Sequence, residues 1–176
     1  MKHKLLALAT AAAALTPMIS RASDGTITFN GRISASTCAV TPASGTIAVT
    51  LPTLSVNTLG SSGAFAGATR FAIAISGCAG GSETNANAFF EAGTNVDAIT
   101  GRLKNTGTAT NVDLQLLTAA GAVINLSNAS GAQYTPQTNN IVSNAATLEY
   151  AVRYYATAQS TAGTVISSVT YSVVYN

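Results

Sequence analysis

The chain is short of the residues on which most enzymes and nucleic-acid-binding proteins depend. Its 176 residues include no Trp and a single histidine, His3, and only 8% of them are charged. Hydrolysis through a serine or cysteine nucleophile needs a base beside it, most often histidine. Binding to a phosphate backbone needs clustered Lys and Arg. The composition therefore argues against both classes of protein.

Residues 1–22 have the pattern of a secretory signal peptide. Basic residues at positions 2–4 precede an apolar, alanine-rich run over residues 5–19, and Ser20-Arg21-Ala22 follows the small-x-small rule for cleavage. The apolar run is shorter than the roughly 20 residues that a membrane span needs. We therefore expect a mature chain of 154 residues that begins at Ser23, has no integral membrane segment and retains no histidine.

Cleavage also changes the charge of the chain. Three basic residues leave with the leader, so five basic and six acidic residues remain, a net charge of −1. The six acids are scattered, which disfavours a catalytic pair of carboxylates and favours solvated surface charge. No phosphate-binding glycine loop or dinucleotide fingerprint occurs in the sequence. We predict no catalytic residues, no metal site, no cofactor and no nucleic-acid partner.

Two cysteines, Cys38 and Cys78, remain after cleavage. In a chain routed to an oxidising compartment, a disulfide is the expected state of such a pair. A closed loop of this size stabilises a fold by roughly 4 kcal/mol in the chain-entropy model. There is no CxxC motif that would indicate redox catalysis, so we predict a structural disulfide.

The mature chain has the alternation of apolar and polar residues that is typical of half-buried strands. Turn-rich stretches separate the strands, and no segment has a convincing amphipathic helical pattern. This rhythm predicts a single-domain, all-β, immunoglobulin-like sandwich with exposed loops over residues 53–69 and 127–143. The predicted strands before the C-terminal segment cover residues 26–33, 47–51, 70–76, 88–91, 111–117, 122–126 and 148–154.

The C-terminal segment, residues 163–176, is the longest of these patterns. Val169, Tyr171, Val173 and Tyr175 share one face of the predicted strand. The segment contains no proline and no charged residue. Soluble proteins use such residues to protect a strand edge from pairing with another chain. We therefore predict that another polypeptide supplies the neighbour of this strand.

The N-terminal segment of the mature chain is a candidate for that neighbour. Ile27, Phe29, Gly31 and Ile33 lie on one face of the strand predicted over residues 26–33. A donor segment and an acceptor edge on the same molecule are complementary head to tail, and contacts of that kind generate open filaments. Pairing of the N-terminal segment with its own domain is the alternative, and it would leave a monomer. A preformed apolar groove would aggregate in water, so the unassembled subunit should need a chaperone.

The sequence resembles the pilins of the chaperone-usher pathway, close to the major subunits of type 1 fimbriae. The resemblance covers essentially the whole mature chain and depends on several features together. These are the leader, the alternation over 26–33, the spacing of the two cysteines, Asn-Val-Asp-Leu-Gln-Leu-Leu at 111–117, Tyr-Tyr-Ala-Thr at 154–157, Gly163 fourteen residues from the C-terminus and the penultimate Tyr175.

The resemblance implies an incomplete immunoglobulin-like β-sandwich, the pilin fold, which a donor strand from a neighbouring subunit completes. The expected division is a signal peptide at 1–22, a donor-strand extension at 23–33 and a pilin domain at 34–176. The donor residues would be Ile27, Phe29, Gly31 and Ile33. The acceptor edge and chaperone recognition site would comprise Gly163, Val169, Tyr171, Val173 and Tyr175.

The function that the resemblance implies is that of a structural subunit of a bacterial surface fimbria, which polymerises by donor-strand exchange and supports cell adhesion. The expected partners are other copies of the chain and related pilins, a periplasmic chaperone and an outer-membrane usher. The expected location is the extracellular fimbria, reached through the periplasm. The alternative is a fimbrial adaptor or a tip adhesin that binds carbohydrate, although a tip protein usually carries an additional lectin domain.

Overall fold

The computed structural model describes residues 28, 31, 33, 35, 37–133 and 139–176. Contacts divide the chain into two units, Met1–Arg32 and Ile33–Asn176, and the fold below is that of the second unit. No helix among the described residues is long and apolar enough to cross a membrane. The predicted signal peptide and its cleavage site lie outside the described residues.

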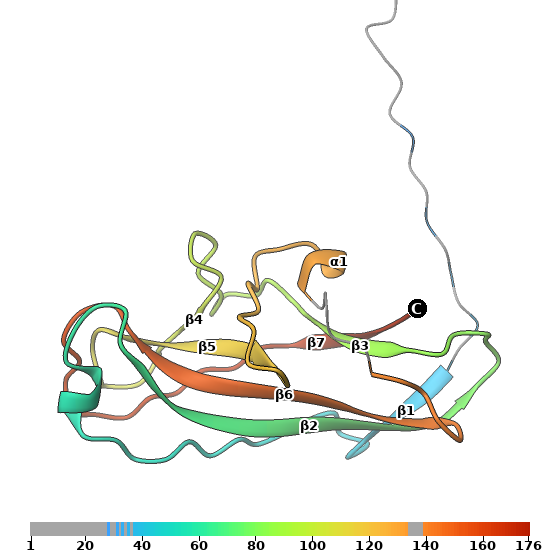
Figure 1. The fold of residues 1–176 in the computed structure, drawn as a ribbon, viewed down its shortest axis with the longest axis horizontal. Coiled ribbons are helices and arrows are strands. Elements are labelled where there is room, and N and C mark those ends of the chain that lie inside the picture. Colours follow the sequence, from blue (N-terminus) through green and yellow to red (C-terminus); the bar gives the residue numbers. More distant parts are fainter. Residues whose placement is uncertain (1–27, 29–30, 32, 34, 36, 134–138) are drawn as a thin grey trace, which may run out of the picture. The chain divides into compact units, whose positions relative to one another are not determined.

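Strands are the main regular elements of the described part of the chain (Figure 1). Two short helical turns accompany them: η1, a 3-10 turn over Val56–Leu59, and α1 over Ser130–Gln133. The strands are β1 (Thr37–Thr41), β2 (Phe65–Ala79), β3 (Ala86–Phe90), β4 (Leu103–Lys104), β5 (Val112–Thr118), β6 (Ala145–Ala156) and β7 (Tyr171–Tyr175).

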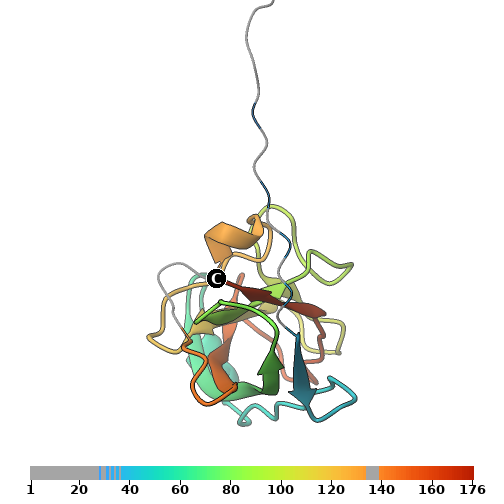
Figure 2. The same ribbon diagram turned by 90° about the vertical axis from the view of Figure 1, so that its right-hand side faces the viewer.

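The strands form two antiparallel sheets. The larger sheet has the order β1-β2-β6-β5-β4, and the smaller sheet pairs β3 with β7. The two sheets form the two layers of a sandwich, which the end-on view of Figure 2 shows. The fold class expected from the sequence, an all-β sandwich, is confirmed.

The core lies between the sheets and depends most on the long pair β2 and β6. Residues opposite each other in an antiparallel pair face the same side, and Ile73 lies opposite Leu148 while Phe71 lies opposite Tyr150. Leu148 is completely buried, and the ring of Tyr150 meets that of Phe90 in β3 edge to face at 5.1 Å between centroids. Each large apolar side chain buried in this way contributes roughly 1.5 to 3 kcal/mol.

The predicted disulfide joins β1 to β2. Cys38 and Cys78 are bonded, with their Cα atoms 4.1 Å apart. β1 is an edge strand of the larger sheet and pairs only with β2. The disulfide therefore attaches the first described strand covalently to the core of the sandwich.

Two strand predictions were wrong in extent. Residues 47–51 are extended but form no strand, because their backbone has no sheet partner among the described residues. Only residues 171–175 of the predicted strand 163–176 pair as a strand, because β3 is five residues long and ends at Phe90. Both differences concern the same part of the molecule, a groove between these two segments.

The patterns over residues 70–76, 88–91, 111–117 and 148–154 placed strands correctly, with different ends, as β2, β3, β5 and β6. Most of the strand predicted over residues 26–33 lies outside the described residues, and the sequence patterns did not predict β1 or β4. The predicted loop over residues 53–69 is shorter than expected, because β2 begins at Phe65 and contains a bulge between Ala66 and Thr69. The predicted hairpin after β5 is present as a bridge between Leu117 and Val123.

Candidate functional site

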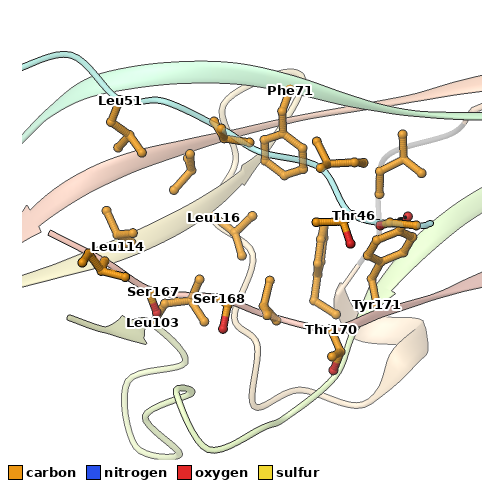
Figure 3. Close-up of a pocket in the computed structure, with 18 of the residues that line it drawn as sticks. Thr46, Leu51, Phe71, Leu103, Leu114, Leu116, Ser167, Ser168, Thr170 and Tyr171 are labelled. Atoms are coloured by element: carbon orange, nitrogen blue, oxygen red, sulfur yellow. Dashed lines mark hydrogen bonds between the residues drawn. The ribbon is translucent and has the colours of Figure 1, made fainter. Parts of the chain in front are cut away.

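A groove of about 760 Å³ lies between two extended segments, of which only the start of β7 is paired in a sheet. One wall is formed by residues 44–51 and the other by residues 165–173, with side chains of β2, β5 and β6 between them. Figure 3 shows Leu51, Phe71, Leu114 and Leu116 around this space. The groove lining contains no charged residue. A site of this shape and chemistry fits an extended apolar segment rather than a small polar ligand.

The first wall has the side-chain pattern of a strand without the pairing of one. Gly45, Ile47, Val49 and Leu51 are half-buried, whereas the residues between them are exposed. None of the backbone groups of residues 47–51 has a hydrogen-bonding partner among the described residues. The wall is thus an extended segment whose backbone donors and acceptors remain available.

The second wall is held by hydrogen bonds on one edge only. The backbone N–H of Ile166 donates to Asn105 Oδ1 at 2.8 Å, and the carbonyl of Ile166 accepts from the N–H of Thr106 at 2.8 Å. The carbonyl of Ser168 accepts from Asn95 Nδ2 at 3.1 Å.

The opposite edge of this wall is free. In an extended chain, successive residues direct their backbone groups to opposite edges. The intervening residues, Val165, Ser167 and Val169, have no backbone partner among the described residues. An unpaired strand edge therefore runs along the groove, with the half-buried side chains of these residues beside it.

Ser167 adds a polar group that has no partner in the described part of the chain. Its Oγ is buried and forms no hydrogen bond with any described residue, although the side chain lines the groove. A buried hydroxyl without a partner costs free energy. A polar group entering the groove would satisfy it.

Tyr171 connects the two walls at one end of the groove. Its hydroxyl donates to the carbonyl of Gly45 at 3.1 Å. Burial raises the pKa of Tyr171 above its ordinary value, which favours the neutral form that can donate this bond. The contact fixes the separation of the walls at this end.

The predicted acceptor residues divide into two groups. Val169, Tyr171 and Val173 line the groove, as their shared face in the sequence suggests. Tyr175 pairs with Ala86 at the far end of β7, beyond the residues that line the groove. Gly163 lies against the backbone of Thr108 and Ala109, and a Cβ atom there would be 2.8 Å from the Cα of Ala109.

The predicted donor residues are described only in part. Gly31 and Ile33 are exposed, Ile33 to 99% of its surface, whereas Ile27 and Phe29 lie outside the described residues. A Cβ atom at Gly31 would meet no described atom within 4 Å. The donor role of this segment therefore stays a prediction.

Sequence reasoning missed most of the first wall and the base of the groove. The short apolar run over residues 47–51 predicted a strand, and only the structure shows that Ile47, Val49 and Leu51 line a groove. Phe71 and Leu116 lie in strands that the sequence predicted over residues 70–76 and 111–117, but no pattern within one strand indicates that its inner face is left partly uncovered. Within the described part of the chain, no cluster of His, Cys, Asp or Glu could hold a metal ion.

Comparisons with known proteins agree on the class of protein that this chain resembles. The family model described as "Type-1 fimbrial protein, A" matches residues 51–176. The major fimbrial subunit SMF-1 of Stenotrophomonas maltophilia (strain K279a) is 44% identical over 93% of this chain and 99% of its own length. The F17 fimbrial protein of Escherichia coli is also 44% identical, over 93% of each chain.

Solved structures show the same fold. The crystal structure of the P pilus rod subunit PapA superposes with a TM-score of 0.59 at 15% identity, covering 79% of this chain and 99% of that chain. The CupB6 tip adhesin from Pseudomonas aeruginosa superposes with a TM-score of 0.55 at 15% identity, over 71% of this chain but 34% of the adhesin. The fold likeness thus extends over the whole of a rod subunit and over one part of an adhesin.

Proposed function

This chain belongs to the type-1 fimbrial protein family and is a structural subunit of an extracellular fimbria, and we propose that it polymerises by accepting a strand from a neighbouring copy in the groove. The two relatives described above are named as a major fimbrial subunit and a fimbrial protein, which supports a structural rather than an enzymatic role. The adhesion that the fibre supports is a general property of fimbriae.

The proposal rests on the two walls of the groove, whose facing backbone groups have no hydrogen-bonding partner among the described residues. Neighbouring strands in a sheet lie about 4.8 Å apart and join through their backbone groups. A single strand inserted between residues 45–51 and 165–171 can hydrogen-bond to both walls and place alternate side chains between the sheets. The same strand would bring a polar backbone group near Ser167 Oγ, which has no partner among the described residues.

The donor we propose is residues 23–33 of the next copy. Ile27, Phe29 and Ile33 would enter the groove, and Gly31 would allow close approach of the backbones. Burial of the three apolar side chains and backbone hydrogen bonds to both walls favour the exchange, and the conformational entropy of the donor segment opposes it. We propose that the exchange is favourable overall because the acceptor walls are already ordered before the donor arrives.

We propose that a periplasmic chaperone occupies the groove before assembly and that an outer-membrane usher is the place of exchange. An uncharged groove of this size would otherwise be exposed to water in each free subunit, and exposed apolar strand edges promote aggregation. The residues 163–175 would form the recognition site for the chaperone, because they carry the free edge of the second wall.

A mixing experiment tests the proposal with two complementary variants. Phe29→Asp would place a charge in the apolar groove and disable the donor, and Val169→Asp would disable the acceptor. Neither variant should polymerise alone, whereas their mixture should form heterodimers and nothing longer, as measured by size-exclusion chromatography with light scattering. Val123→Asp is the control, because Val123 is 53% exposed and does not line the groove. Polymers from either variant alone would contradict the proposal.

A further inference from the structure

The smaller sheet has two edges to which an incoming strand could add. One edge belongs to β7 and continues into the groove, and the other belongs to β3 (Figure 1). A strand that adds through backbone hydrogen bonds can join any edge whose N–H and C=O groups are free. The state of the backbone groups of β3 therefore decides whether assembly has one acceptor edge or two.

The residues of β3 alternate between the two edges. The odd-numbered positions face β7, as the hydrogen bonds between Asn85 and Asn176 and from Glu91 N–H to the Thr170 carbonyl show. The even-numbered positions, Ala86, Ala88 and Phe90, therefore direct their backbone groups to the outer edge.

Each even-numbered position already has a partner. The N–H of Ala86 donates to the carbonyl of Asn139 at 2.9 Å, and the N–H of Ala88 donates to the hydroxyl oxygen of Tyr150 at 2.8 Å. The N–H of Phe90 donates to Gln133 Oε1 at 3.0 Å. The three partners come from three different parts of the chain, so all three N–H groups of this edge are bonded, although only an isolated bridge between Asn85 and Asn140 pairs with it.

Gln133 closes the edge at Phe90 as a strand would. Its Nε2 donates to the carbonyl of Phe90 at 2.9 Å while its Oε1 accepts from the N–H of the same residue. The same Nε2 lies 3.0 Å from the carbonyl of Asn128, and the side chain is 3% exposed. The amide group therefore reproduces both hydrogen bonds that a neighbouring strand would make, and the turn α1, which Figure 1 shows beside β3, holds it in place.

Tyr150 closes the edge at Ala88 from the opposite sheet. It belongs to β6, is 1% exposed and reaches across the core to the backbone of β3. Its ring packs edge to face against Phe90. The hydroxyl group therefore hydrogen-bonds to the edge of β3, while the ring packs in the core.

We propose that Gln133 and Tyr150 determine the specificity of strand addition by closing the outer edge of β3, so that the donor segment of a second copy joins the β7 edge alone. The inference rests on the proposed function, because it takes residues 23–33 of another copy as the incoming strand. The contrast between the edges supports it: the N–H groups of Val165, Ser167 and Val169 have no partner among the described residues, whereas the N–H groups of Ala88 and Phe90 are bonded to side chains.

Photo-crosslinking tests this proposal in the full chain secreted from its own leader. The chain carries Phe29→Asp, so that its own donor is disabled, and receives a synthetic peptide of residues 23–33 with a photoreactive amino acid in place of Thr28. The labelled residues are mapped by mass spectrometry. We expect labelling of residues 45–51 and 165–171 alone in this parent.

Two further variants open the outer edge by different routes. Gln133→Leu removes both hydrogen bonds to Phe90. Tyr150→Phe removes the hydroxyl group and keeps the ring. If one of the two variants does not fold, the other still tests the proposal. Either variant should raise labelling of residues 84–90 and 139–141 by about tenfold, the factor that corresponds to the loss of one hydrogen bond. Gln115→Leu is the matched control, because Gln115 is 7% exposed and lies in β5.

The possible results separate this inference from the proposed function. New labelling at the β3 edge in the two variants, and none in the control, supports the inference. Labelling that stays within the groove in both variants overturns the inference and leaves the proposed function intact. Equal new labelling in Gln115→Leu also overturns the inference, because it would show that any such substitution loosens the fold. Absence of groove labelling in the parent contradicts the proposed function and, with it, this inference.

Discussion

Gly163 shows how a single residue shapes the acceptor side of the groove. The sequence singled it out only through its position relative to the C-terminus in a family resemblance. The structure supplies a physical reason, because a Cβ atom at this position would overlap the backbone nitrogen of Ala109 and lie 2.8 Å from its Cα. The backbones of residues 163–166 and 105–109 can lie side by side only with glycine there. No sequence pattern could have indicated this approach, since it depends on two segments more than 50 residues apart.

We expect Gly163→Ala to destabilise the fold by about 1 to 3 kcal/mol, the usual range for overpacking against groups that cannot move freely. Urea unfolding measures the change. Gly93→Ala is the control, because nothing lies within 4 Å of the Cβ position at Gly93. Equal stability of the two variants would show that the backbone of Ala109 gives way at no cost.

The buried side chain of Tyr150 leads us to expect a specific dependence of the free energy of unfolding on pH. Burial raises the pKa of Tyr150 above the ordinary value of 10.0. A raised pKa in the folded state means that the contribution of this group is fully present below pH 10 and is lost as the pH rises through the folded pKa. Burial raises the pKa values of Tyr154 and Tyr171 in the same direction, so Tyr150 accounts for part of the alkaline loss.

Tyr150→Phe should be about 1 to 3 kcal/mol less stable at neutral pH, because the buried N–H of Ala88 loses its acceptor. The variant should also lose less stability than the parent above pH 10. Urea unfolding at a series of pH values measures both effects. A parallel pH profile in the two proteins would show that ionisation of Tyr150 is not linked to unfolding.

At the scale of elements, the sequence predicted the paired strands better than the unpaired ones. The alternation over residues 70–76, 111–117 and 148–154 correctly predicted β2, β5 and β6, because each of these strands has a paired neighbour on each side. The same alternation over residues 47–51 and 163–170 could not show that the backbone lacks a sheet partner, because side-chain burial and backbone pairing are separate properties of an extended segment. The roles of α1 and Gln133 were also not predicted, since a four-residue turn has no period to detect.

The side chain of Asn105 holds the second wall of the groove, residues 165–173, in place through hydrogen bonds. Its Oδ1 accepts from the N–H of Ile166 and of Gly107, each at 2.8 Å, and its Nδ2 donates to the carbonyl of Ala109 at 2.8 Å. Asn105→Ala should therefore increase hydrogen exchange over residues 164–170 and weaken binding of the donor peptide by about tenfold or more, through loss of one or more hydrogen bonds. Asn57→Ala, in the exposed turn η1, is the control. Unchanged exchange over this segment would mean that the wall is held by other contacts.

At the scale of the whole molecule, the fold is a sandwich whose smaller sheet has one closed edge and one open edge. The disulfide, the long pair β2 and β6, and the contact between Tyr150 and β3 stabilise the sandwich. The groove on the open side remains uncovered by any described residue. The core of the sandwich and the groove are separate parts of the fold. The subunit can therefore be stable and still require a neighbour, because the core forms before the groove is filled.

Thermal unfolding of the Phe29→Asp chain with increasing concentrations of a peptide of residues 23–33 tests the central claim most directly. Binding to the folded state alone stabilises a protein by about 2.7 kcal/mol at a ligand concentration of 100 times Kd, which corresponds to a rise in Tm of roughly 5 to 11 °C for a domain of this size. We predict a saturable rise of this size, and none with a peptide in which Phe29 is replaced by Asp. An unchanged Tm with both peptides would show that the fold needs no further strand, and would contradict the proposed mechanism of polymerisation.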